Sequence, residues 1–185
     1  MRVISGDLKG RSIRFLKNLN TRPLKDSVRE NIFNILYHSS LMKTKISSSN
    51  ILDLYSGIGS FGIECISRGA EKVTFVEQDI NATLVLKENL INLSIFNKSI
   101  VHNKKIENVL PDLNEKFNIF FFDPPFKDDS YLQNIQLIKR KKIFKKNHIV
   151  IIHREKGTKD EFSDILKMIH SKKYGRSEIL FGVFN

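Results

Sequence analysis

The feature that most limits the fold is an alternation that begins at Ile51. Short apolar runs are followed there by segments in which apolar residues recur at helical spacing. Strands joined by helical crossovers run parallel and need helices on both faces of their sheet, so this pattern predicts a doubly wound, mostly parallel α/β fold. The apolar runs cover residues 51–54, 72–77, 99–103, 117–123 and 148–153, and the helical patterns cover residues 60–68, 80–94, 105–112, 129–139 and 160–170.

The C-terminal part of the chain departs from this alternation. Residues 173–179 and 180–184 are typical of two strands, and no helical segment separates them. Strands with so short a connection pair antiparallel. With the five earlier runs, they predict a seven-stranded sheet with an antiparallel C-terminal strand.

The N-terminal part has an organisation of its own. Residues 1–16 contain two short alternating runs around the turn sequence DLKG, which predicts a β-hairpin. Residues 26–39 carry one apolar face at helical spacing and predict a helix. A serine run at residues 47–49 ends this part. We therefore expect a hairpin-and-helix extension at residues 1–46, packed on a main domain of residues 47–185.

Composition narrows the class of protein. The chain has no run of 18 apolar residues, and its start lacks the unbroken apolar core of a secretory signal, so we expect a cytoplasmic protein without a membrane anchor. One cysteine and five scattered histidines predict neither disulfides nor a metal site. The 31 basic and 20 acidic residues give a net charge of +11, which favours a polyanionic partner. A solvated, lysine-rich surface is the alternative explanation.

A glycine-rich loop follows the first strand of the alternating region. The sequence DLYSGIGSFG, residues 53–62, contains a GxGxxG spacing that permits close approach of a ligand to the backbone where a helix begins. Glu77 ends the next strand, where its carboxylate can accept hydrogen bonds from two ribose hydroxyls. This pair of features fits NAD and S-adenosylmethionine equally well. The glycines by themselves also fit a tight turn without a ligand.

A second motif, DPPF at residues 123–126, ends the fourth strand. The carboxyl ends of parallel strands line one crevice, so we expect this motif to face the glycine loop. Its two prolines fix the backbone and lack N–H groups, which makes the carbonyls of the turn rigid acceptors. Phe126 offers a flat surface on which a nucleobase can stack.

This motif suits chemistry on an exocyclic base amine. The lone pair of such an amine is delocalised into the ring, which makes the nitrogen a poor nucleophile. A carboxylate and a carbonyl that each accept one N–H favour a pyramidal nitrogen with its lone pair directed outward. A sulfonium methyl group held in line can then be attacked directly, by positioning and electrostatics and without a metal.

Taken together, the glycine loop, Glu77 and residues 123–126 resemble a class I S-adenosylmethionine-dependent methyltransferase with a Rossmann-like sheet. Two N-terminal segments, MRVISGDLKGRSIRF and TRPLKDSVRENIFNIL, narrow the resemblance to the bacterial 16S ribosomal RNA guanine-N2 methyltransferase family. The Gly59–Glu64 and Ser67–Ala70 segments match that family as well. The resemblance implies methyl transfer to one guanine N2 amine of 16S rRNA, in a small ribosomal subunit or an assembly intermediate. From the size of the chain we expect a monomer.

The resemblance also implies roles for individual residues. The guanine is expected at the fourth-strand motif, and the cofactor at the loop between the first strand and its helix, with an arginine of the N-terminal link closing over the pocket. The catalytic residues would be Asp123, Pro124, Pro125 and Phe126, and the cofactor-binding residues Asp53, Gly57, Gly59, Glu77 and Arg22.

One part of the family pattern is altered at the adenine end of the cofactor site. Such enzymes often place Asp or Asn after the third strand, where its side chain reaches the adenine, whereas this chain has Lys104 and Lys105. A backbone amide near Lys105 or Ile106 would then make that contact.

Basic residues cluster in the first 29 residues, which we expect to bind RNA. Arg29 is placed by the helical pattern on the polar face of the predicted helix. A second basic run, residues 139–146, is more typical of a solvated helix end. The residues assigned to RNA contact are Arg11, Arg14, Arg22, Lys25 and Arg29.

Three other functions compete with this interpretation. An adenine-N6 DNA methyltransferase uses a similar Pro-Pro-aromatic turn, but the chain leaves no room for a target-recognition region beyond its N-terminal hairpin. An NAD-dependent oxidoreductase would explain the GxGxxG but not residues 123–126. A non-catalytic RNA-binding module would leave the cofactor and catalytic motifs without a purpose.

Overall fold

The computed structural model describes residues 1–16, 24–158 and 161–185. Among the described residues, no helix is both long and apolar enough to cross a membrane. Three short 3-10 helices connect the larger elements: η1 (Phe96–Lys98), η2 (Ile106–Asn108) and η3 (Leu110–Asp112). In chain order the helices and strands are α1 Asp26–His38, β1 Asn50–Leu54, α2 Ser60–Ser67, β2 Lys72–Val76, α3 Ile80–Asn92, β3 Ser99–His102, β4 Phe117–Phe122, α4 Tyr131–Lys141, β5 Phe144–Glu155, β6 Leu166–Tyr174 and β7 Ser177–Phe184.

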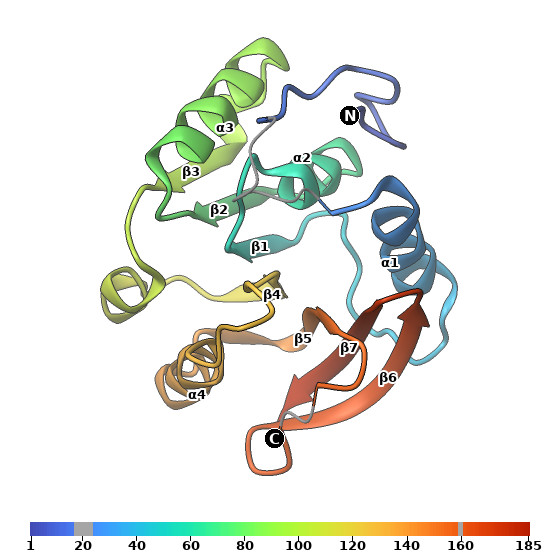
Figure 1. Cartoon of the computed structure of the whole chain (residues 1–185), viewed down its shortest axis with the longest axis vertical. Coiled ribbons are helices and arrows are strands. Elements are labelled where there is room, and N and C mark those ends of the chain that lie inside the picture. The colour runs from blue at the N-terminus through green and yellow to red at the C-terminus, as the bar shows by residue number, and fades with distance from the viewer. Residues whose placement is uncertain (17–23, 159–160) are drawn as a thin grey trace.

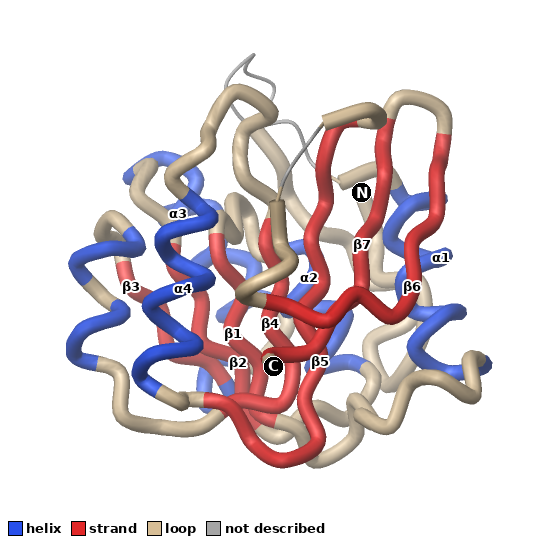
Figure 2. Tube along the Cα trace, turned by 90° about the horizontal axis from the view of Figure 1, so that it is seen from below, coloured by secondary structure: helices blue, strands red, loops and turns tan. Residues whose placement is uncertain are grey.

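One mixed sheet organises the described residues, with the strand order β3-β2-β1-β4-β5-β7-β6 (Figure 1, Figure 2). Neighbouring strands from β3 to β5 pair parallel, whereas β7 pairs antiparallel with both β5 and β6. The predicted fold class, a seven-stranded doubly wound sheet with an antiparallel C-terminal strand, is confirmed.

Both faces of the sheet are buried, and β4 shows how. Ile119 and Phe121 pack into the apolar cluster that contains residues of α1, α2 and α3, whereas Phe120 and Phe122 pack into the cluster that contains α4. Successive residues of a strand point to opposite faces, so an unbroken apolar run is what a doubly covered strand requires. Figure 1 shows α2 and α3 on one side of the strands and α4 on the other.

Two predicted helices are wrong. Residues 105–112 form the separate turns η2 and η3, because Pro111 supplies no N–H for a continuous α-helix. Within the predicted helix 160–170, residues 166–170 form the beginning of β6 and residues 161–165 form a loop and turn. The helical signal came from Phe162 and Ile165, which enter the core from a turn in which the Ile165 amide donates to the Phe162 carbonyl.

The C-terminal strands are also divided differently from the prediction. Gly175, with φ +57°, lies in the turn between β6 and β7, and β7 is one continuous strand across the predicted boundary at residue 180. The glycine permits a backbone conformation that other residues rarely adopt. This turn matters for the site because it reaches the cavity described below.

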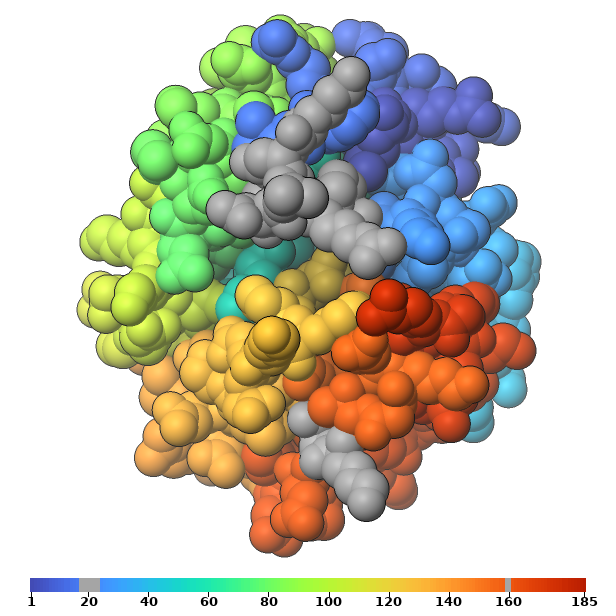
Figure 3. Space-filling view, in the orientation of Figure 1, coloured from blue at the N-terminus to red at the C-terminus, as the bar shows by residue number. Residues whose placement is uncertain are grey.

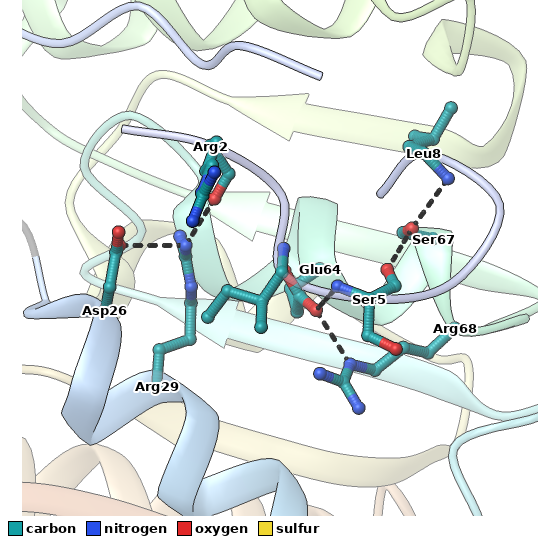
Figure 4. A network of polar contacts seen from close by, with 9 residues as sticks. Arg2, Ser5, Leu8, Asp26, Arg29, Glu64, Ser67 and Arg68 are labelled. Atoms are coloured by element: carbon teal, nitrogen blue, oxygen red, sulfur yellow. Dashed lines mark hydrogen bonds and ion pairs between the residues drawn. The ribbon is translucent and has the colours of Figure 1, made fainter. Parts of the chain in front are cut away.

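The N-terminal hairpin is only partly formed. Its two arms run antiparallel around the bridge between Arg2 and Ser12, with backbone bonds from the amide of Val3 to the carbonyl of Arg11 and from the amide of Ile13 to the carbonyl of Met1, both at 2.9 Å. The first arm also bonds to α2, because the amides of Ile4 and Ser5 donate to the buried carboxylate of Glu64 at 2.8 and 2.9 Å. Figure 4 shows this attachment. Apolar residues of the extension share a core cluster with the sheet, and the division after residue 46 stays a prediction.

Candidate active site

A cavity of about 680 Å³ opens at the carboxyl ends of the parallel strands. Its walls come from the loops after β1 and β2, the turn after β4, the end of β5, the β6–β7 turn and the beginning of α1. In Figure 3 the yellow segment after β4 and the dark red turn between β6 and β7 meet near the centre of the visible face. Gly57 and residues 123–126 all line this cavity, which confirms that the two sequence motifs face one crevice.

The glycines of the loop after β1 serve different purposes. A Cβ on Gly59 would lie 2.3 Å from Cδ1 of Leu86, and one on Gly62 would lie 2.3 Å from Cε1 of Phe75, so packing requires both glycines. Gly57 has φ +54° with open space at its Cβ position, and it lines the cavity. Gly57 is therefore placed to face a ligand. The contact predicted between Gly59 and the cofactor stays a prediction.

Asp53 lies behind the loop rather than in the cavity wall. It is 1% exposed, and its Oδ2 accepts the amide N–H of Gly62 at 3.0 Å. Burial raises the pKa of this carboxyl well above its usual value, with the nearby acidic groups adding to the shift. The direct contact predicted between Asp53 and the cofactor stays a prediction: Oδ2 supports the glycine loop, and Oδ1 is buried without a hydrogen-bond partner among the described residues.

Glu77 lies in the cavity wall and holds two loops together. Its Oε2 accepts the amide N–H of Gly57 at 2.8 Å, and its Oε1 accepts that of Asp79 at 2.8 Å. Asp79 in turn caps α3, because its carboxylate accepts amide N–H groups from the first turn of that helix. The carboxylate predicted to bind a ribose is thus fixed beside Gly57.

Asn103, which the sequence analysis overlooked, directly follows β3. Its side-chain amide donates to the carbonyls of Glu77 at 3.0 Å and Gln78 at 3.1 Å, and so braces the loop after β2. The sequence signal for Asn103 was its position at the end of the third strand, close to where the family places Asp or Asn. The predicted strand included Asn103, so Lys104 and Lys105 were taken as the residues that follow it. Lys105 and Ile106 are not part of the cavity wall, and the backbone contact predicted for them stays a prediction.

Asp123 begins the turn after β4, with its side chain 23% exposed. Its Oδ1 lies 2.7 Å from Nδ1 of His153, which stands beside it on β5. The ring of Phe126 contacts the same imidazole edge-on, with centroids 5.8 Å apart. The sequence analysis assigned no role to His153, because the pairing of β4 with β5 was needed to bring it to Asp123.

Arg154, also overlooked, fixes the shape of this turn. The side chain is 1% exposed, and its guanidinium donates to the carbonyls of Pro125 and Phe126, both at 3.3 Å. The same guanidinium lies 4.6 Å from the ring centroid of Tyr131. A buried arginine is the donor that two adjacent carbonyls of a proline turn require, because the turn has few N–H groups of its own.

Comparisons with known proteins identify the family. A family model described as "Conserved hypothetical protein 95" matches residues 1–183. Ribosomal RNA small subunit methyltransferase D of Buchnera aphidicola is 36% identical over 154 residues, which are 83% of this chain and 78% of that protein. The chain belongs to this methyltransferase family.

Solved structures agree with this assignment. A protein of Escherichia coli, described as a methyltransferase, superimposes with a TM-score of 0.84 at 26% identity, covering 98% of this chain and 96% of that one. A methylase-type protein of Haemophilus influenzae gives a TM-score of 0.79 at 29% identity, with the same coverage. The chain is an S-adenosylmethionine-dependent methyltransferase, and the alternatives of an oxidoreductase and a non-catalytic module are not favoured.

The loop after β1 fits the cofactor of this methyltransferase. Ser56 Oγ is buried and has no hydrogen-bond partner within the described part of the chain, yet Ser56 belongs to the cavity wall. Such an unpaired buried hydroxyl is costly unless a ligand or water satisfies it. Beside it stand the open backbone of Gly57 and the carboxylate of Glu77. These groups suit the polar nucleoside part of S-adenosylmethionine.

The methyltransferase's expected RNA-binding residues are not equally placed. Arg29 is fully buried and donates to the carbonyl of Arg2 at 2.6 Å and to Asp26 at 3.0 Å (Figure 4). Burial lowers the pKa of the guanidinium, with Asp26 and Glu64 acting in the opposite direction. The assignment of Arg29 to RNA contact is corrected: its side chain has no surface to offer, and it anchors the N-terminal arm to α1.

The other residues assigned to RNA contact differ in their exposure and in their partners. Arg14 is 69% exposed and pairs with Glu88 at 2.7 Å, and Arg11 donates to the carbonyl of Asn92 at 3.0 Å on the surface. Lys25 is exposed and lines the cavity. Arg22 lies outside the described residues. The predicted RNA contacts of Arg11, Arg14 and Lys25 stay predictions.

Proposed function

We propose that this chain methylates the exocyclic N2 amine of a specific guanine in 16S ribosomal RNA. The observation that carries the proposal is the turn at residues 123–126, whose carboxylate and stacking ring stand in the same cavity as Gly57 and Glu77. Relatives named ribosomal RNA small subunit methyltransferase D support the choice of substrate. S-adenosylmethionine, when bound, supplies an electrophilic methyl group.

The residues of the turn at 123–126 have different proposed roles in binding the base. Asp123 accepts one N–H of the amine and stabilises the positive charge that develops on nitrogen as it is methylated. Arg154 donates to the carbonyls of Pro125 and Phe126, and the carbonyl of Pro124 is the proposed acceptor for the second N–H. The ring of Phe126 is exposed enough to line the cavity and offers the base a stacking surface.

Glu77 and the backbone at Gly57 hold the cofactor side of the cavity. Their mutual hydrogen bond fixes the loop before any ligand arrives, and such preorganisation lowers the entropic cost of bringing two reactants together. The methyl donor and the amine are thereby kept in one partly enclosed space.

The substrate form and the assembly state are parts of the same proposal. The target guanine is presented by a small ribosomal subunit or by an assembly intermediate, and the enzyme acts as a monomer in the cytoplasm. The net charge of +11 supports a partner rich in phosphate. The proposed phosphate contacts are exposed basic residues, among them Lys25 in the cavity wall and Arg11 and Arg14 on the surface beside the C-terminal half of α3.

Asp123→Ala tests the proposal directly. Single-turnover methylation of small-subunit particles should fall by about 100- to 1,000-fold, the usual effect of removing one preorganised electrostatic contact. Binding of S-adenosylmethionine, measured by calorimetry, should persist. Asp112→Ala is the matched control, since this exposed aspartate lies outside the cavity wall and should leave the rate near the parental one. A parental rate for Asp123→Ala would make the turn purely structural.

Nucleoside analysis of the product separates the proposal from its nearest rival. An adenine-N6 methyltransferase would use the same turn but produce N6-methyladenine. The proposal requires N2-methylguanine in the digested RNA. N6-methyladenine in its place would show that the enzyme is an adenine-N6 methyltransferase.

A further inference from the structure

His153 and Asp123 form a pair that the proposed mechanism does not yet use. Ile152 and Phe122 are register partners in the β4–β5 ladder, so the next residue of each strand stands side by side at the cavity edge. The 2.7 Å separation of Nδ1 and Oδ1 is in the range of charge-assisted hydrogen bonds. The imidazole is 11% exposed and lines the cavity.

The partners of the imidazole define its protonation. An ionised carboxylate only accepts, so the proton of this bond belongs to Nδ1. Nε2 is buried and has no hydrogen-bond partner among the described residues. The geometry is therefore that of an imidazole whose Nδ1–H donates to Asp123.

The bond also restricts Asp123. Oδ1 is occupied by His153, so Oδ2 is the oxygen that remains for the substrate amine. The ring of Phe126 packs edge-on against the imidazole. His153 therefore contacts both the Asp123 carboxylate and the ring proposed to stack on the base. A carboxylate fixed before the substrate arrives has less orientational freedom to lose in the transition state.

We propose that His153 is a positioning residue, which aims the Asp123 carboxylate at the base amine through its Nδ1–H. This inference rests on the proposed function, because it assigns to Asp123 the acceptor role on the amine. His153 acts through Asp123 and not by contact with the reacting atoms. Its loss should slow the chemical step without weakening the capture of RNA.

Three substitutions separate positioning from mere packing. His153→Leu should lower kcat by about 10- to 100-fold, the range found when a supporting hydrogen-bond partner of a functional side chain is removed. KM for the small-subunit particle should change less than about 2-fold, since the substitution removes no contact that binds the substrate and the transition state equally. His153→Asn keeps an N–H donor at the level of Nδ1 and should restore most of kcat. His153→Gln carries the same amide one methylene further out and should not.

Two outcomes of this series would overturn the inference. Equal kcat values for the Asn, Gln and Leu variants would show that the donor at the Nδ1 level has no role. A loss confined to KM would assign His153 to RNA capture instead. Circular dichroism identifies a variant that has failed to fold, and if the Leu variant fails, the Asn-to-Gln comparison decides by itself.

A spectroscopic measurement tests the pair without any turnover. Nitrogen-15 NMR of the imidazole in the parental protein should show a proton on Nδ1 that is hydrogen-bonded to a carboxylate. A proton on Nε2 alone would contradict the inference. If the parental protein yields no N2-methylguanine, the proposed function fails, and the NMR result still decides whether His153 orients Asp123.

Discussion

Arg29 is the residue for which sequence and structure make opposite predictions. As an RNA contact, its loss would weaken RNA binding and leave stability unchanged. As the buried anchor seen here, its loss would destabilise the protein and leave the salt dependence of RNA binding unchanged. The substitution Arg29→Met keeps an unbranched apolar stem and removes only the guanidinium, so it distinguishes the two roles.

The size of the effect follows from the partners of Arg29. Its 2.6 Å bond to the Arg2 carbonyl is a bond to a charged donor, worth about 1.5–3 kcal/mol. The pair with Asp26 contributes little, about 0.5 kcal/mol, because that carboxylate is 52% exposed. Burial already opposes the charge of Arg29, so methionine recovers part of the loss. The expected net destabilisation is about 1–3 kcal/mol.

Thermal unfolding and salt-dependent RNA binding together provide the assay. The loss corresponds to a fall in Tm of roughly 2–12 °C for a chain of this size. Arg11→Met is the matched control: its exposed guanidinium should change stability by less than about 0.5 kcal/mol. If Arg11 contacts a phosphate, its variant should reduce the salt slope by about 0.7–0.9. An unchanged Tm together with a reduced slope for Arg29→Met would refute the anchoring role.

Two further predictions concern the cofactor side of the cavity. Glu77→Ala should weaken binding of S-adenosylmethionine by about 1–3 kcal/mol, because a loop acceptor and a ligand partner are lost together; calorimetry that finds parental affinity would remove Glu77 from the site. Asp53→Asn should raise stability at neutral pH, because its amide oxygen can still accept the Gly62 N–H and carries no buried charge. The raised pKa of Asp53 means that its contribution to stability is full below about pH 3.8 and is lost as the pH rises through the folded-state value. Denaturant titration from about pH 3.8 to neutral pH should show no such decline in the unfolding free energy of Asp53→Asn. An identical pH dependence in variant and parent would contradict a raised pKa of Asp53.

The parts of the fold that follow from local pattern were predictable. The apolar run of β4 needs a sheet covered on both faces, and the loop at residues 53–62 needs a strand before it and a helix after it. Residues 160–170 were predicted wrongly because Phe162 and Ile165 have helical spacing, while pairing with β7 decides that β6 is a strand. Such pairing is tertiary and leaves a weak local signal.

The candidate site was predictable where a motif carried it and not where pairing created it. Gly57, Glu77 and Asp123 were recognised from their places at strand ends, and all three line the cavity. The supporting residues His153 and Arg154 were missed, since only the β4–β5 register places them beside Asp123 and the prolines. The buried position of Arg29 was missed for a related reason: its partner is a backbone carbonyl from a distant arm.

Methylation of a guanine N2 amine in small-subunit rRNA is the proposed activity from which the roles of Asp123 and His153 follow. Mass-spectrometric mapping of that RNA, from cells with and without the protein, tests this claim most directly. N2-methylguanine at one nucleotide should disappear without the protein, return with the parental chain and fail to return with Asp123→Ala. An unchanged level of N2-methylguanine at every position in cells that lack the protein would contradict it.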